Sequence, residues 1–95
     1  MPDTPAVTRN DSASEFEIRT DAGTALLRYS RNGNVLDLIH TEVPGELAGR
    51  GLGSLLAKFA LDYARANNLK VIASCPFVHT YMSRHHEYDD LRAVA

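Results

Sequence analysis

AGRGLGSLLAKFALDYARANNLKVIASCPF, residues 48–77, starts with glycines at three alternate positions and continues into a segment with helical periodicity. Its apolar residues recur at the spacing of one helix face, which predicts an amphipathic helix that ends near Asn67. These residues are Leu52, Leu55, Leu56, Phe59, Ala60, Tyr63 and Ala64. KVIASC, residues 70–75, then has the composition of a short buried strand. With a strand before the helix, this segment predicts a right-handed parallel crossover.

Three strands are expected before the glycines. EFEIRT and TALLRYSR, residues 15–20 and 24–31, flank the turn residues DAG, and VLDLIHTEV, residues 35–43, follows the turn residues NGN. Short turns between the strands predict an antiparallel meander. Alternation along the third strand predicts two sets of side chains on opposite faces. One set is Val35, Asp37, Ile39, Thr41 and Val43, and the other is Leu36, Leu38, His40 and Glu42.

After the crossover, Pro76 suits the first turn of a second helix, PFVHTYMSRHH. The predicted order is therefore βββαβα, an α+β or α/β fold with a mixed sheet of about four strands and two helices. Residues 1–14 are rich in Pro, Thr, Asp and Ser without periodicity, and we expect a flexible N-terminal arm there. Residues 15–95 then form a single domain.

The composition is that of one soluble globular domain, with 95 residues of which 44% are hydrophobic and 23% charged. A net charge of −2, without a stripe rich in Lys or Arg, argues against a nucleic-acid partner. The first residues lack the pattern of a signal peptide and no run of about 18 apolar residues occurs, so no membrane partner is expected. Cys75 is the only cysteine, which excludes an intrachain disulfide and favours the cytoplasm. Because a chain this short has a small core, a monomer or a weak homodimer is expected.

The glycine cluster suggests a site for an anion. The first N–H groups of a helix lack intrahelical partners and carry a partial positive charge. Glycines at 49, 51 and 53 would let this backbone approach a phosphate, while Arg50 and Ser54 could add polar contacts. The alternative is that the glycines only permit a tight turn from strand to helix. Neither the nucleotide-triphosphate loop nor the dinucleotide fingerprint fits their spacing.

The motifs from Leu36 to about Leu91 occur in a distinctive order: HTEVP, then G-x-G-x-G-S at the start of a helix, a strand that ends in CPF, and H-x-E-Y. This arrangement resembles the short, YjdJ-type branch of the GNAT N-acetyltransferase superfamily. The resemblance implies an acetyl-coenzyme A (acetyl-CoA) fold, with the pyrophosphate at the glycine turn and the pantetheine beside the third strand. The cofactor-binding residues it implies are Thr41, Val43, Gly49, Arg50, Gly51, Leu52, Gly53, Ser54 and Pro76. Ala48 departs from the superfamily pattern, which has Gln or Arg there.

Cys75 is the first catalytic candidate. It lies where a strand meets a helix start, and the free N–H groups there favour the thiolate, which is the nucleophilic form of cysteine. The resemblance implies that Cys75 faces the thioester and takes the acetyl group before the acceptor receives it. The alternative is that Cys75 packs as a small buried hydrophobe.

His40 and Glu42 are candidates for the general base. A histidine titrates near neutral pH and could accept the proton of an acceptor amine, whereas a carboxylate on this strand serves in many superfamily members. His40 could equally be a structural residue bonded to the backbone. No metal site is expected, because His79, His85 and His86 do not combine with Cys75 at a known ligand spacing.

The resemblance thus implies a small N-acetyltransferase that moves an acetyl group from acetyl-CoA to an unidentified amine, with Cys75 as a candidate intermediate carrier. A protein amine or a bulky partner fits better as the acceptor than an enclosed small molecule, because the chain lacks the segments with which longer superfamily members enclose one. One alternative is a non-catalytic module that binds or senses acyl-CoA. Another is a thiol-based redox sensor that uses Cys75.

Overall fold

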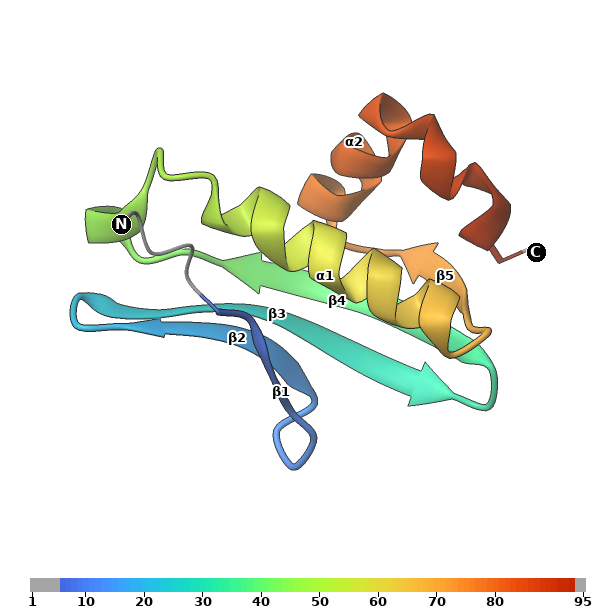
Figure 1. Cartoon of the computed structure of the whole chain (residues 1–95), viewed down its shortest axis with the longest axis horizontal. Helices are drawn as coiled ribbons and strands as arrows, with labels where there is room; N and C mark the ends of the chain where they lie inside the picture. Colours follow the sequence, from blue (N-terminus) through green and yellow to red (C-terminus); the bar gives the residue numbers. More distant parts are fainter. Residues whose placement is uncertain (1–5, 94–95) are drawn as a thin grey trace.

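The computed structural model describes residues 6–93, which form one five-stranded sheet with two α-helices (Figure 1). The elements are β1 (Thr8–Asn10), β2 (Glu15–Thr20), β3 (Gly23–Asn32), β4 (Val35–Glu42), the 3₁₀ turn η1 (Gly45–Leu47), α1 (Leu52–Ala66), β5 (Lys70–Ala73), α2 (Pro76–Arg84) and the 3₁₀ segment η2 (His86–Leu91). The strands lie in chain order, β1 to β4 are antiparallel, and β5 pairs in parallel with β4. The α+β class, the mixed sheet and the parallel crossover are confirmed.

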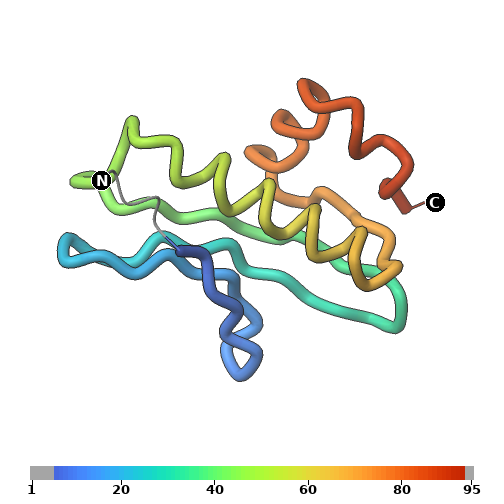
Figure 2. The backbone as a smooth tube through the Cα atoms, in the orientation of Figure 1, coloured from blue at the N-terminus to red at the C-terminus, as the bar shows by residue number. Residues whose placement is uncertain are grey.

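The backbone trace shows how the chain turns from β4 into α1, crosses the sheet and returns as β5 (Figure 2). α1 packs on one sheet face, and α2 contacts α1, β4 and β5. The opposite face, which we call the open face, has no helix packed on it within residues 6–93. No helix in this range is long and apolar enough to cross a membrane.

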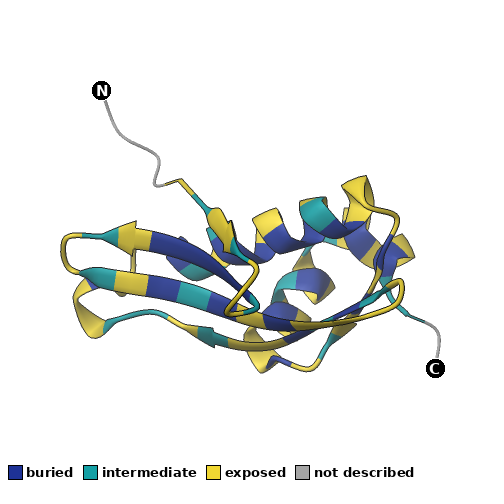
Figure 3. Cartoon of the chain, turned by 90° about the horizontal axis from the view of Figure 1, so that it is seen from below, coloured by how far each residue is buried: buried dark blue, intermediate teal, exposed yellow. Residues whose placement is uncertain are grey.

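The core lies between α1, α2 and the covered sheet face. Buried and exposed residues alternate along much of β3, whereas Glu15–Ile18 of β2 are all buried (Figure 3). In the sheet, Phe16 pairs with Leu27, and both side chains are fully buried. The buried residues of α1 are Leu52, Leu56, Ala57, Ala60, Leu61 and Ala64. Leu55 and Tyr63 are only half-buried and Phe59 is exposed, so the buried face is rotated slightly from the predicted stripe.

The first strand corrects the prediction of a flexible arm over residues 1–14 and of about four strands. Thr8–Asn10, which is β1, pairs antiparallel with Glu15–Glu17 and raises the number of strands to five. Residues 1–5 of the predicted arm lie outside the described residues. The Asn10 amide donates to Glu17 Oε2 at 3.1 Å, and the Arg9 guanidinium lies 4.9 Å from the centre of the Tyr63 ring. Main-chain pairing and these polar contacts hold the strand, so its sequence needs no apolar alternation.

A β-bulge in β4 corrects the predicted orientation of its second half. Leu38 pairs with Tyr29 and His40 pairs with Arg28, so Ile39 is an extra residue between them. From there the alternation reverses, and Thr41 lies opposite the buried Leu27 on the covered face. The side chains of Thr41 and Val43 therefore share a face with Leu36 and Leu38, whereas those of His40 and Glu42 lie on the open face.

Leu56→Ala is expected to lower the free energy of unfolding by about 2–5 kcal/mol, because Leu56 is fully buried between α1 and the sheet. Leu55→Ala is the matched control, since Leu55 precedes it in the same helix and is only half-buried. Urea denaturation followed by circular dichroism measures both losses. Equal losses would contradict the helix orientation described above.

Candidate functional site

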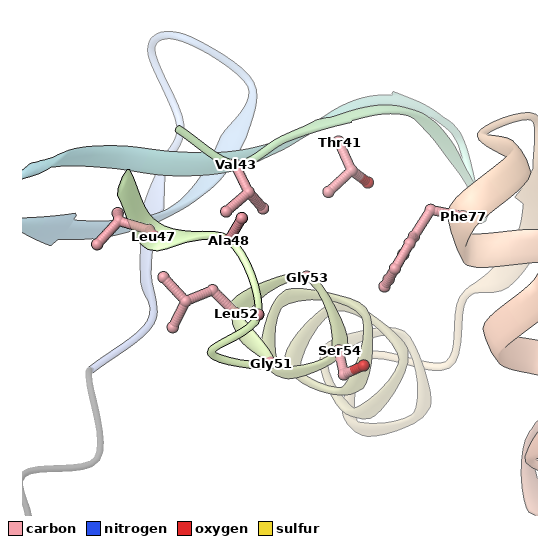
Figure 4. Close-up of a pocket in the computed structure, with 10 residues that line it drawn as sticks. Thr41, Val43, Leu47, Ala48, Gly51, Leu52, Gly53, Ser54 and Phe77 are labelled. Carbon is pink, nitrogen blue, oxygen red and sulfur yellow. The ribbon is translucent and has the colours of Figure 1, made fainter. Parts of the chain in front are cut away.

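A cavity of about 390 Å³ lies between the end of β4 and the start of α1, with Phe77 of α2 on its third side (Figure 4). Its lining residues are Thr41, Val43, Leu47, Ala48, Gly49, Gly51, Leu52, Gly53, Ser54 and Phe77. The cavity exists because β4 and β5 diverge. Their last ladder pair joins Leu38 to Ala73, after which only the Cys75 N–H donates back to the Leu38 carbonyl, at 2.8 Å. The rest of β4, from Ile39 to Glu42, has no β5 partner.

The start of α1 forms one wall of the cavity. Gly51 caps the helix in the left-handed conformation, with φ of 75°, and its carbonyl accepts the first helical hydrogen bond, from the Leu55 N–H. No side chain caps this end and no acidic residue lies in its first turn. The N–H groups of Leu52, Gly53 and Ser54 thus lack intrahelical acceptors, as at any helix start. This wall can accept an anion.

The three glycines serve two different purposes. Gly49 and Gly51 have φ of 82° and 75°, a conformation that glycine adopts at little cost, and a Cβ on either would meet nothing within 4 Å. A tight turn explains both of them. Gly53 has an ordinary helical φ, yet a Cβ there would lie 2.9 Å from Cζ of Phe77. Gly53 therefore permits a close approach of the ring to the helix, which a turn alone does not require.

Phe77 is positioned by the contacts that hold the C-terminal segment against α1. The Tyr88 hydroxyl donates to Asp62 Oδ1 at 2.7 Å, and the Arg65 guanidinium donates to both carboxylate oxygens of Asp90. Burial and the hydrogen bond to Asp62 raise the pKa of Tyr88, which therefore remains a hydrogen-bond donor across the neutral range. These contacts fix η2, and α2 is held between η2, α1 and the sheet.

Cys75 lies next to the cavity, and the side chain of Thr41 stands between its sulfur and the cavity. It is 3% exposed and stands immediately before α2, and its Sγ lies 3.3 Å from Oγ1 of Thr41. Thr41 itself lines the cavity. Since the thiol and the hydroxyl can share a hydrogen bond, the sulfur is linked to the cavity through one side chain.

His40 and Glu42 form a pair on the open face. Nε2 of His40 lies 3.3 Å from Oε2 of Glu42, and both side chains are more than half exposed. The structure thus brings these two base candidates together, but it does not bring either of them to the cavity or to Cys75. They belong to the same unpaired stretch of β4 as Thr41, on its other face.

The cavity lining contains seven of the cofactor-binding residues expected from the sequence, but not Arg50 or Pro76, which are both exposed. It also contains Leu47, Ala48 and Phe77, which were not expected. Phe77 follows Pro76 in the CPF motif, but a single aromatic residue in a first helical turn is equally typical of core packing. Within residues 6–93 no group of three His, Cys, Asp or Glu side chains could hold a metal ion.

Residues 15–91 match the family model for GCN5-related N-acetyl-transferases. The chain therefore belongs to the GCN5-related N-acetyltransferase family. Its fold is similar to the NMR solution structure of a GCN5-like protein from Staphylococcus aureus, with a TM-score of 0.73 and 31% identity over 95% of this chain and 89% of the other.

Curated relatives that match are Protein NATD1 from Homo sapiens, at 39% identity over 72% of this chain and 63% of the relative, and Protein NATD1 from Mus musculus, at 37% over 72% and 64%. The chain thus spans slightly less than two thirds of the length of these relatives. The family resemblance of the sequence is confirmed, and the predicted fold class is confirmed with one strand more than expected.

Proposed function

We propose that this chain binds acetyl-CoA in the cavity at the start of α1 and transfers the acetyl group to an amine. The observation that carries the proposal is that β4 and β5 diverge beside an uncapped, glycine-lined helix start. Membership of an N-acetyltransferase family supports the same conclusion. Bound acetyl-CoA would supply an acetyl group activated as a thioester.

The residues around the cavity fit such a ligand. The N–H groups of Leu52, Gly53 and Ser54 are suited to the pyrophosphate, whose charge the helix start would stabilise. A Cβ at Gly53 would lie 2.9 Å from the Phe77 ring, so the bare backbone there lets the ring pack against the helix start beside the cavity. The unpaired backbone of β4 offers hydrogen-bonding groups to the amides of the pantetheine arm.

Two groups of side chains have proposed roles in the chemistry. The Cys75 sulfur, next to the cavity wall, is the proposed carrier of the acetyl group. The His40 and Glu42 pair, on the other face of β4, is the proposed acceptor of the proton that the amine must lose. The amine would then approach from the open face. A thiol carrier must stay reduced, which suits the cytoplasm as the proposed location.

The test is a transfer assay on the purified chain. Acetyl-CoA is mixed with a panel of alkyl amines and lysine-containing peptides, and chromatography measures the released coenzyme A while mass spectrometry measures the acetylated product. We expect a product that depends on the chain and on acetyl-CoA. Tight binding of acetyl-CoA by calorimetry without any product would contradict transfer to these amines.

One observation favours a second candidate, a non-catalytic module that senses acyl-CoA. Ala48 lines the cavity where the superfamily pattern has Gln or Arg, so one polar contact to the phosphates is missing. In such a module, which has no turnover to lose, His40→Ala and Glu42→Gln would change local stability but leave acyl-CoA binding unchanged. In an enzyme they would lower kcat and leave the affinity for acetyl-CoA intact.

A further inference from the structure

A second cavity, of about 320 Å³, lies on the open face of the sheet. Its lining residues are Ser30, Asn32, Val35, Asp37 and Ile72, which come from three neighbouring strands. Asp37 is central, because it pairs with Ser30 on β3 and with Ile72 on β5. Nothing in the proposed acetyl transfer uses this cavity.

The carboxylate of Asp37 is poorly satisfied. Its Oδ1 is shielded from solvent and has no hydrogen-bond partner among the described residues. A covered carboxylate oxygen without a partner is costly, and a native structure usually keeps one for a reason. Asp37 also lines the cavity, so a cation there would lie beside this side chain.

Asp37 also lacks a basic side chain as a partner, unlike the other acidic residues of the open face. Glu15 is bound to Arg28 at 2.8 Å and Glu17 to Arg19 at 3.0 Å. Glu42 lies 3.3 Å from His40. No basic side chain within residues 6–93 forms an ion pair with Asp37. The cavity therefore complements a cation.

The other lining residues indicate which cation would fit. Ser30 and Asn32 add a hydroxyl and an amide to the lining beside Asp37, and a primary ammonium group has three donors for such oxygens. Val35 and Ile72 are apolar, and Ile72 is 45% exposed, so methylene groups can pack against them. We propose that the Asp37 cavity binds a primary ammonium group on an alkyl chain, and that this group belongs to the acetyl acceptor.

The assignment of this ammonium group to the acetyl acceptor rests on the proposed acetyl transfer and on the position of Asp37 along β4. Asp37 is one residue before Leu38, whose carbonyl is bonded to the Cys75 N–H. A strand advances about 3.3 Å per residue, so Asp37 is roughly 7 Å along β4 from Ile39, where β4 and β5 have parted. An acceptor held at Asp37 by one ammonium group could present a second amine at this opening. The class of acceptor is therefore a diamine or a lysine side chain beside another amine.

The first experiment measures binding without acetyl-CoA. The ¹⁵N-labelled chain is titrated with 1,4-diaminobutane, with N-acetyl-lysine methylamide and with uncharged 1,4-butanediol, and the amide shifts near Asp37 are followed by NMR. Both amines are expected to bind and the diol is not. Asp37→Asn should weaken amine binding by about tenfold or more, whereas Asp21→Asn, in the exposed turn after β2, should not. The tighter amine identifies the source of the ammonium group.

A second variant tests the same site through stability. Ile72→Lys would place a tethered ammonium beside Asp37, so it should raise the midpoint of thermal unfolding relative to Ile72→Met and abolish amine binding. Amine binding that survives both Asp37→Asn and Ile72→Lys, or that the diol reproduces, would overturn the proposal and leave Asp37 a carboxylate without a ligand.

Transfer kinetics then separate this inference from the proposed function. If acetyl is transferred, Asp37→Asn should raise KM for 1,4-diaminobutane by about tenfold, with the affinity for acetyl-CoA unchanged. Amine binding at Asp37 without any transfer would refute the proposed function but support the site. Transfer to amines that is insensitive to Asp37 would support the function and refute the acceptor role.

Discussion

Gly53→Leu is expected to lower the affinity for acetyl-CoA by about 100-fold or more, which corresponds to roughly 2.7 kcal/mol. A Cβ at this position would lie 2.9 Å from the Phe77 ring, and the rest of the leucine side chain would occupy the cavity between the end of β4 and the start of α1. The helix itself should tolerate the change, because leucine has a much higher helix propensity than glycine and the Phe77 ring, 43% exposed, can turn outward. Function should therefore be lost without loss of the fold.

Isothermal calorimetry measures this change, with the unfolding midpoint recorded for each variant. The matched control is Gly45→Leu, which inserts the same side chain in η1, where a Cβ meets nothing within 4 Å and φ is not positive. Gly45 does not line the cavity, so binding by the control should equal that of the unchanged chain. A Gly53→Leu variant that binds normally would place the pyrophosphate somewhere other than the start of α1.

Most of the fold follows from local sequence patterns. The alternation in EFEIRT and TALLRYSR and the apolar spacing from Leu52 to Ala64 are properties of neighbouring residues, and the structure has a strand or a helix at each. Thr8–Asn10 carries no such pattern, because an edge strand needs only backbone partners. Its pairing depends on Glu15–Glu17, and nothing within residues 8–10 alone indicates that partner.

The bulge at Ile39 limits what the sequence could tell about the site. Strict two-residue periodicity along LDLIHTEV assigns His40 to the face of Leu38, although two apolar residues, Leu38 and Ile39, are adjacent there. The extra residue is visible only in the pairing with β3, where Tyr29 and Arg28 are adjacent but their partners Leu38 and His40 are not. Because of this one extra residue, the side chain of Thr41, and not that of His40, faces the cavity.

The glycines predict the position of the cavity more reliably than the strand pattern does, because their signal does not depend on strand register. Gly49, Gly51 and Gly53 precede a strong helical pattern, and all three line the cavity. Phe77 was missed because its role comes from a close approach to Gly53, which is distant in the sequence. Close approaches between separate helices depend on the tertiary arrangement and have no local signature.

Cys75→Ala is expected to lower kcat/KM for acetyl transfer by about 1,000-fold, or roughly 4 kcal/mol in transition-state stabilisation. In the proposed reaction the Cys75 thiolate forms a bond to the acetyl carbon and coenzyme A leaves as its thiolate. The amine then attacks the acetyl-cysteine, loses its proton and releases the cysteine sulfur. Without the sulfur neither step can occur, yet the affinity for acetyl-CoA should change less than about twofold, because Cys75 does not line the cavity.

Intact-mass spectrometry of the chain mixed with acetyl-CoA alone provides the decisive measurement. One acetyl group should appear on the unchanged chain and none on Cys75→Ala, since Cys75 is the only cysteine. Thr41→Val is the graded control: it preserves the shape of the side chain and removes the hydroxyl that lies 3.3 Å from the sulfur, so the adduct should form more slowly but still form. A Cys75→Ala variant that transfers acetyl at the full rate would show that the amine attacks the thioester directly. The thiol would then be a buried packing residue behind Thr41, and catalysis would depend on the open-face pair of His40 and Glu42.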